Sequence, residues 1–235
     1  MELNPFILAI ETATEVCSVG LFQGETLIGV HELFVPQAHA KFLTTLVDSV
    51  MKAAGISYSE LSSVAVSAGP GSYTGLRIGT STAKGIAFAQ SIPIIPIPTL
   101  QGIACQLLPT ITLFPKSQIG VLLDARRMEV YYQFFTSELA PLQPNPQPVI
   151  LTEPLLKSWC KQASTIFLGS GASKIRPFLT HVAQQSILLP QITGSVRGWG
   201  KLILEKWINQ QIANLDTFEP DYIKPVMPTI EKPKL

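Results

Sequence analysis

Residues 66–85 read Val-Ser-Ala-Gly-Pro-Gly-Ser-Tyr-Thr-Gly-Leu-Arg-Ile-Gly-Thr-Ser-Thr-Ala-Lys-Gly, and they constrain the fold more than any other part of the chain. They predict the end of a buried strand, a glycine turn, and then a helix with one very small face. Gly75, Gly79 and Ala83 recur every four residues, so they share that face. Because each glycine inside a helix costs about 1 kcal/mol relative to alanine, the pattern indicates close approach of another backbone.

The glycine turn allows two interpretations. Ser72 or Thr74 can cap the helix and leave N–H groups free to bind an anion. The spacing, however, is one residue longer than the dinucleotide-binding fingerprint, and no Gly-Lys-Ser/Thr follows as in a P-loop. The turn alone therefore fits both an anion site and tight helix packing.

The composition narrows the class of protein. Of the 235 residues, 46% are hydrophobic and only 14% are charged, which favours a permanent partner or an oligomer. A net charge of +1 argues against a protein that binds nucleic acid without a partner protein. Cys17, Cys105 and Cys160 form no C-x-x-C pair and are expected to be reduced core thiols. Without a signal segment or a long apolar run, we expect a cytoplasmic protein with no membrane partner.

The hydrophobic pattern predicts two similar halves. The first hundred residues give the order βββαβαβ, with strands at 6–10, 18–22, 26–34, 64–68 and 92–97 and helices at 38–54 and 72–90. The second half partly repeats this order, with strands at 120–123, 129–136, 148–151 and 165–168 and helices at 153–162 and 199–213.

We therefore expect an N-terminal lobe over residues 1–100 and a reduced C-terminal lobe over 101–215, with helix 199–213 a candidate to pack back on the first lobe. Residues 216–235 contain four prolines and are expected to form an extended tail.

Three motifs carry a resemblance to a known family. They are Ile-Leu-Ala-Ile-Glu-Thr-Ala-Thr-Glu-Val-Cys-Ser-Val-Gly at 7–20, Gly-Pro-Gly-Ser-Tyr-Thr-Gly-Leu-Arg-Ile-Gly at 69–79, and Leu-Asp-Ala-Arg-Arg-Met-Glu-Val-Tyr at 123–131. Together they resemble the TsaB (YeaZ) family, a paralogue of the transferase TsaD in the synthesis of threonylcarbamoyl-adenosine next to the anticodon of ANN-decoding tRNAs. The resemblance implies an α/β protein of the actin-like ATPase (ASKHA, ribonuclease H-like) fold with two βββαβαβ lobes.

The resemblance also implies which chemical parts of TsaD are missing. TsaD binds a metal through an H-x-x-x-H pair, and Thr99 and Ile103 stand at those two positions here. Neither side chain can replace imidazole, so we expect no metal and no catalytic residue. A vestigial phosphate loop, compatible with weak ATP or ADP binding, is expected from the threonines and the glycine turn, namely Thr12, Thr14, Gly69, Gly71, Ser72 and Thr74. Glu11, at the end of the first strand, is expected to cap a turn rather than to orient a metal.

Two helices are the candidate partner surface. Helix 38–54 carries more large apolar residues than one packed face needs, and the small face of helix 72–90 lies next to it. The predicted interface residues are Phe42, Leu46, Val50, Tyr73, Gly75, Leu76, Arg77, Gly79, Ala83 and Ile86. Core burial is the alternative for this stripe. On the docking interpretation, Gly75→Leu or Gly79→Leu would block docking while leaving the monomer folded.

The expected function is that of a non-catalytic subunit that docks TsaD, forms a platform for the ATPase TsaE, and meets tRNA through the complex. The isolated chain could also form a homodimer through an overlapping surface. The alternative from another class is a stand-alone ATP-dependent kinase or hydrolase of the actin-like fold, which would need an intact nucleotide site.

Overall fold

The chain forms two five-stranded sheets, and the computed structural model describes residues 4–114, 117–162, 164–178 and 186–223. The elements of the first half are β1 (Phe6–Glu11), β2 (Cys17–Gln23), β3 (Thr26–Leu33), α1 (Ala38–Ala54), the 3-10 turn η1 (Tyr58–Glu60), β4 (Leu61–Gly69), α2 (Tyr73–Gln90) and β5 (Ile94–Pro98). The connection to the second half contains α3 (Thr99–Ala104) and the 3-10 turns η2 (Cys105–Leu107) and η3 (Ile111–Leu113). The second half consists of β6 (Gln118–Asp124), β7 (Glu129–Phe135), β8 (Gln147–Ile150), α4 (Glu153–Gln162), β9 (Thr165–Leu168), the 3-10 segment η4 (Ser170–Phe178), β10 (Ile187–Leu189) and α6 (Gly200–Ile208).

The two sheets have the same topology. The strand order is β3-β2-β1-β4-β5 in the first and β10-β9-β6-β7-β8 in the second, so both follow the order 3-2-1-4-5 when strands are counted within each half. In each sheet an antiparallel meander of three strands is extended by two parallel strands. This repeat confirms the predicted α/β class with two actin-like lobes.

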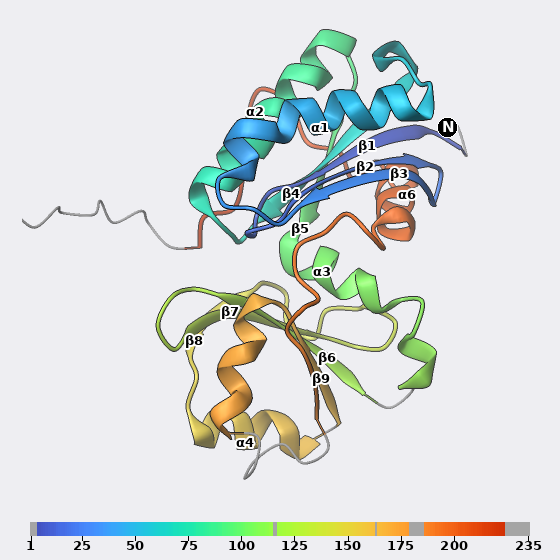
Figure 1. Cartoon of the computed structure of the whole chain (residues 1–235). Coiled ribbons are helices and arrows are strands. Elements are labelled where there is room, and N and C mark those ends of the chain that lie inside the picture. The colour runs from blue at the N-terminus through green and yellow to red at the C-terminus, as the bar shows by residue number, and fades with distance from the viewer. Residues whose placement is uncertain (1–3, 115–116, 163, 179–185, 224–235) are drawn as a thin grey trace, which may run out of the picture.

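The helices and sheets stack in layers (Figure 1). Helices α1 and α2 cover one face of the first sheet, and α3 and α6 lie between the two sheets. The largest hydrophobic cluster joins both sheets, since it contains Ile7 and Ile95 from the first, Ile119 and Ile166 from the second, and Trp199 between them. The two lobes therefore share this cluster, and each has a further cluster on the outer face of its own sheet.

Four segments differ from the sequence expectation. Helix α6 ends at Ile208, short of the predicted 199–213, because the chain turns at Gln210 and Ala213 N–H then donates to Ile94 O on the edge strand β5. The predicted extended tail is packed as far as it is described: Phe218 packs against the core of the first lobe, and Asp221 N–H donates to Ala68 O. Residues 224–235 lie outside the described part. Helix α3 and strand β10 are additions that the pattern did not predict.

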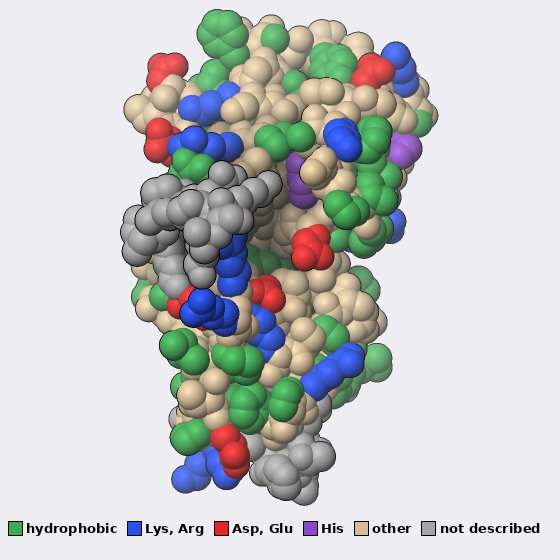
Figure 2. All heavy atoms as spheres, turned by 60° about the vertical axis from the view of Figure 1, so that its left-hand side comes forward, with side chains coloured by type: hydrophobic (Ala, Val, Ile, Leu, Met, Phe, Trp, Pro, Cys, Tyr) green, Lys and Arg blue, Asp and Glu red, His purple; other side chains and the backbone are tan. Residues whose placement is uncertain are grey.

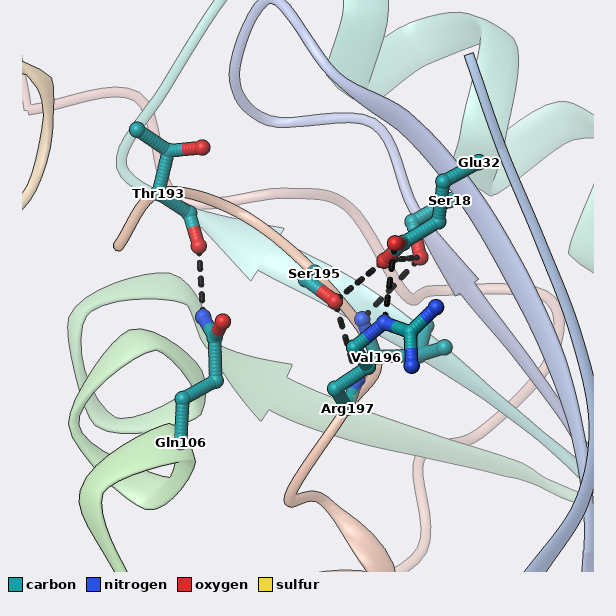
Figure 3. Close-up of polar contacts among 7 residues, drawn as sticks. All are labelled: Ser18, Glu32, Gln106, Thr193, Ser195, Val196 and Arg197. Atoms are coloured by element: carbon teal, nitrogen blue, oxygen red, sulfur yellow. Dashed lines mark hydrogen bonds and ion pairs between the residues drawn. The ribbon is translucent and has the colours of Figure 1, made fainter. Parts of the chain in front are cut away.

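A cluster of polar side chains fixes the segment that returns from the second lobe to the first (Figure 3). Glu32 on β3 accepts hydrogen bonds from Ser195 Oγ at 2.5 Å, from Arg197 Nε at 2.9 Å and from Ser18 Oγ at 3.1 Å. Ser18 Oγ in turn accepts from Val196 N–H. Below it, Gln106 Nε2 donates to the Thr193 carbonyl. These contacts hold residues 193–197, here called the return segment, against the first sheet.

The Glu32 carboxylate is stabilised in its charged form. Burial alone would raise the pKa of Glu32, but the hydrogen bonds from Ser195, Arg197 and Ser18 and the charge of Arg197 outweigh burial and lower the pKa below its usual value of 4.5. A group with a lowered folded-state pKa stabilises the fold above the unfolded pKa and loses that contribution as the pH falls through the folded value.

We predict that Glu32→Gln lowers the free energy of unfolding by about 1.5–3 kcal/mol at pH 7, the range for hydrogen bonds to a charged group. The difference from the unchanged chain should shrink below pH 4.5, where Glu32 takes up a proton. Urea denaturation across this pH range measures both. Lys157→Gln, which breaks an exposed pair with Glu153, is the control and should cost no more than about 0.5 kcal/mol. Equal effects of the two changes would contradict the role assigned to Glu32.

Candidate functional site

The small face of α2 packs against the turn that follows β1. A Cβ atom added at Gly75 would collide with the Thr12 carbonyl oxygen, and one at Gly79 would collide with Thr12 Oγ1. Thr12 is fully buried there. The close approach that the glycine spacing predicted is therefore real, but the approaching backbone belongs to the chain itself.

This packing corrects half of the predicted partner interface. Gly75 and Gly79 lie under Thr12, while Val50, Leu76 and Ala83 are buried in the monomer, each with 1% exposure or less. The other five predicted residues reach the surface in part or in full, namely Phe42, Leu46, Tyr73, Arg77 and Ile86. The prediction that leucine at Gly75 or Gly79 would leave the monomer folded is wrong, because no space exists for the side chain.

The structure brings the predicted phosphate-loop residues together, and the N–H groups of two of them, Thr12 and Ser72, donate to partners within the chain. Ser72 N–H donates to Ala13 O, Gly75 N–H to Ser72 Oγ, and Thr12 N–H to Ser67 Oγ. Thr14 is buried under Gly194 of the return segment, Gly71 abuts Ala13, and Gly69 lies under the Asp221 carbonyl. Of the six residues, only Ser72 and Thr74 are exposed. The buried residues of this loop therefore form a packed junction, whereas Ser72 and Thr74 lie at the surface.

Between α1 and α2 the surface forms a groove of about 280 Å³. Its lining residues are Thr44, Val47, Tyr58, Ser81, Thr82, Gly85 and Ile86. Gly85 faces open space, since nothing lies within 4 Å of an added Cβ atom. Near it on α2, Phe88 leaves 77% of its surface exposed, and Phe42 on α1 leaves 41% exposed. The groove and the Phe88 ring are here called the α1–α2 face. Phe42 lies about 200° around α1 from the lining residue Thr44 and so faces away from the groove.

The sequence interpretation missed Gly85, Phe88 and Tyr222. Gly85 follows Gly79 by six positions, which places it about 240° around the helix and off the small face. A helical wheel would have separated it from Gly75 and Gly79. Tyr222 packs its ring against Tyr73 with centroids 4.9 Å apart, and Arg77 stacks over Tyr73 with its guanidinium carbon 4.2 Å from the centroid. No local signal in the C-terminal segment predicts this contact.

The carboxyl group of Glu11 is buried at the carboxyl end of β1. Glu11 Oε1 accepts the Ala13 N–H at 2.5 Å, which confirms the predicted turn-capping role. Burial raises the pKa of Glu11 to about 7, although the hydrogen bonds from Ala13 and Ser67 act in the opposite direction. Its charge and, above all, burial raise the pKa of the neighbouring Cys17 thiol to about 11. Near neutral pH, Glu11 thus changes between a neutral and a charged buried group.

Comparisons with known proteins place this geometry in a family. Residues 25–140 match the family model described as TsaD, tRNA N6-adenosine threonylcarbamoyltransferase. The Bacillus subtilis (strain 168) protein named tRNA threonylcarbamoyladenosine biosynthesis protein TsaB is 31% identical over 170 residues, which cover 71% of this chain and 72% of that protein. The chain belongs to the TsaB family. This confirms the resemblance carried by the three sequence motifs to the TsaB family, a paralogue of TsaD.

Other TsaB relatives match over shorter regions. The Haemophilus influenzae TsaB protein is 33% identical over 129 residues, 55% of this chain and 53% of that protein. The chain thus spans about half the length of this curated relative. The solved structure titled YeaZ from Pseudomonas aeruginosa has a TM-score of 0.78 at 22% identity and covers 93% of this chain and 100% of that one. That likeness shows the same fold.

The positions that correspond to the histidine pair of TsaD lie inside the lobe junction. Thr99 and Ile103 are on α3, and their side chains are at most 1% exposed. Trp199 packs its indole over Gly102 in the same helix. In this TsaB-family chain, α3 is therefore a core helix that joins the two sheets. No described helix is both long and apolar enough to cross a membrane.

We predict that alanine at Gly75 or Gly79 lowers the free energy of unfolding by about 1–3 kcal/mol, because the added Cβ overpacks the contact with Thr12. Gly85→Ala should raise it by about 1 kcal/mol, since it improves helix propensity in open space. Chemical denaturation of the three variants measures this. A stabilising Gly79→Ala would show that α2 does not pack on Thr12.

The buried Glu11 gives a pH-dependent prediction. Its folded-state pKa lies above the unfolded value of 4.5, so charging it costs stability progressively from pH 4.5 to about 7. Glu11→Gln should therefore be more stable than the unchanged chain at pH 8, by something on the order of 3 kcal/mol, and equal to it near pH 5. Urea midpoints at several pH values test this. A Gln variant that is less stable at pH 8 would mean that the carboxylate is the favoured form.

Proposed function

We propose that this chain is the non-catalytic subunit of the tRNA threonylcarbamoyl-adenosine transferase complex and that it docks TsaD through the α1–α2 face. Membership of the TsaB family supports the pathway. The docked pair would then offer a platform to the ATPase TsaE and meet tRNA, while the chemistry takes place in TsaD. The observation that carries the docking role is the apolar groove beside Gly85.

The groove has the features of a docking site for an apolar helix. Val47 and Ile86 contribute apolar side chains to its lining, and Thr44, Ser81 and Thr82 contribute short ones. Gly85 contributes no side chain, so a partner backbone can approach α2 closely there. The exposed ring of Phe88 leaves an apolar area near the groove, which a partner would remove from water. These features support helix-to-helix docking.

The arrangement of the first lobe supports a non-catalytic role. In the turn after β1 and the glycine turn after β4, the N–H groups of Thr12, Ala13 and Ser72 donate to acceptors within the chain. The return segment and the Asp221 backbone cover them from outside. Hydrogen bonds within the chain hold these loops in one conformation without a bound ligand, which suits a subunit that acts as a scaffold.

The test is complex formation by Gly85 variants. We predict that the unchanged chain and TsaD from the same organism elute as one complex in size-exclusion chromatography with light scattering. Gly85→Leu should fill the groove and reduce complex formation at least tenfold, while circular dichroism and the melting temperature show a folded chain. Gly85→Ala is the matched control, because it changes helix propensity without filling the groove, and it should still bind.

Separate elution of the unchanged chain and TsaD at micromolar concentrations would contradict the docking proposal. Full binding by the folded Gly85→Leu variant would move the interface away from the α1–α2 face. A homodimer of the isolated chain that the leucine variant abolishes would show that the same face also mediates self-association.

A further inference from the structure

The turn between β6 and β7 carries two arginines in a costly backbone conformation. Arg126 has a φ angle of 72° and Arg127 one of 48°, both in the left-handed region where glycine and asparagine are usual. Strained backbone of this kind concentrates at functional sites, where the surrounding structure enforces it. The two residues therefore have a local conformation that stability alone does not favour.

Contacts on both sides hold this turn rigid. Asp124 Oδ1 accepts the Arg126 N–H at 2.6 Å and the Lys174 ammonium at 2.8 Å. Lys174 also donates to the Glu129 carbonyl, and Ala125 N–H donates to the same carbonyl. The Asp124 N–H donates to Ser170 Oγ in the segment that follows β9. The turn is thus tied to the neighbouring strand end.

The side chains of the two arginines give the turn a positive charge. The negative charge of Asp124 is compensated by Lys174, whose side chain is only 12% exposed. Glu129 is partly buried and engaged in a contact of its own. No ion pair of Arg126 or Arg127 occurs within the described part of the chain, and Arg127 is exposed. Two guanidinium groups therefore remain available to an external anion.

The location is one where ligands bind in folds of this type. Strands β6 and β9 are parallel, and the turn lies at their carboxyl ends, where ligands of open α/β sheets are found. Figure 2 shows Lys and Arg side chains gathered beside the hollow between the two lobes, with a few acidic side chains among them. The arginines line neither the α1–α2 groove nor a cavity of about 60 Å³ near Cys105.

We propose that the Arg126–Arg127 turn binds phosphate groups, and that their source is the backbone of an RNA. Guanidinium groups suit phosphate because they donate in a planar fork. A free nucleotide needs an enclosed pocket to bury its base, whereas an exposed rigid turn suits a long polyanion that presents successive phosphates. This inference rests on the proposed function, which brings the chain to tRNA, and adds a direct contact to it.

The test compares two double variants of the isolated full chain. Arg126→Asn with Arg127→Asn removes both charges and keeps residues that tolerate positive φ, so the melting temperature should stay equal or rise. Lys41→Gln with Lys84→Gln removes the same charge from α1 and α2 and is the control. Binding to a fluorescein-labelled tRNA transcript is measured by anisotropy at several salt concentrations.

We expect the arginine variant to bind the transcript roughly tenfold more weakly than the unchanged chain at low salt. Its plot of log affinity against log salt should be shallower by about 2, one for each lost phosphate contact. The lysine control should bind nearly as well as the unchanged chain. An equal loss of RNA affinity in both double variants would overturn the proposal, because it would indicate only non-specific electrostatic attraction to the whole protein.

Two further arms identify the ligand. A thermal shift with Mg-ATP that disappears in the arginine variant, without RNA binding by the unchanged chain, would assign the phosphate to a nucleotide. Displacement of the RNA by poly-glutamate at equal charge concentration would show that the turn does not prefer phosphate and would overturn the proposal, as would no binding in any arm. If the unchanged chain binds RNA but forms no complex with TsaD, the docking proposal is refuted and the RNA-binding proposal stands.

Discussion

The contact between α2 and the turn after β1 is the constraint on which the first lobe depends. Thr12 occupies the space that side chains at positions 75 and 79 would fill, so the helix can lie directly on the strand ends. This contact fixes the rotation of α2 about its axis. Gly85 and Phe88 must then face outward, and the apolar surface beside α1 follows from that rotation. Gly75 and Gly79 thus determine which residues lie on the outer face of α2, although they are not on that face themselves.

The same packing explains why the first lobe combines an ATPase-like topology with closed loops. In this fold the carboxyl ends of β1 and β4 are where a ligand would approach. Here the backbone N–H groups at these ends donate to Ala13, Ser72, Ser67 and Glu11, all within the chain. The return segment is held over the turn by Glu32, and Asp221 covers Gly69. Internal hydrogen bonds therefore engage part of the donors that a bound phosphate would use.

Much of the fold could be predicted from the sequence. The period of the apolar residues predicted both halves, the exact range of α1, and every strand of the two sheets except β10, because burial of one face dominates those elements. What failed depended on distant partners. The short α6 follows from pairing of Ala213 with Ile94, and the ordered start of the tail follows from Asp221 and Ala68. The residues around 213 and 221 show no sequence pattern that predicts their hydrogen bonds to β5 and β4.

The candidate site was predicted in location but not in detail, and the reason is geometric. A small helix face indicates close approach, yet the sequence does not say whether the approaching backbone belongs to the same chain. Gly75 and Gly79 approach Thr12, whereas Gly85 approaches nothing. A helical glycine that packs against its own chain is required by the fold. A helical glycine that faces open space destabilises the helix, and no contact within the chain compensates for that loss. The second kind is the stronger indication of a partner, so Gly85 rather than Gly75 or Gly79 marks the surface where another protein would bring its backbone close to α2.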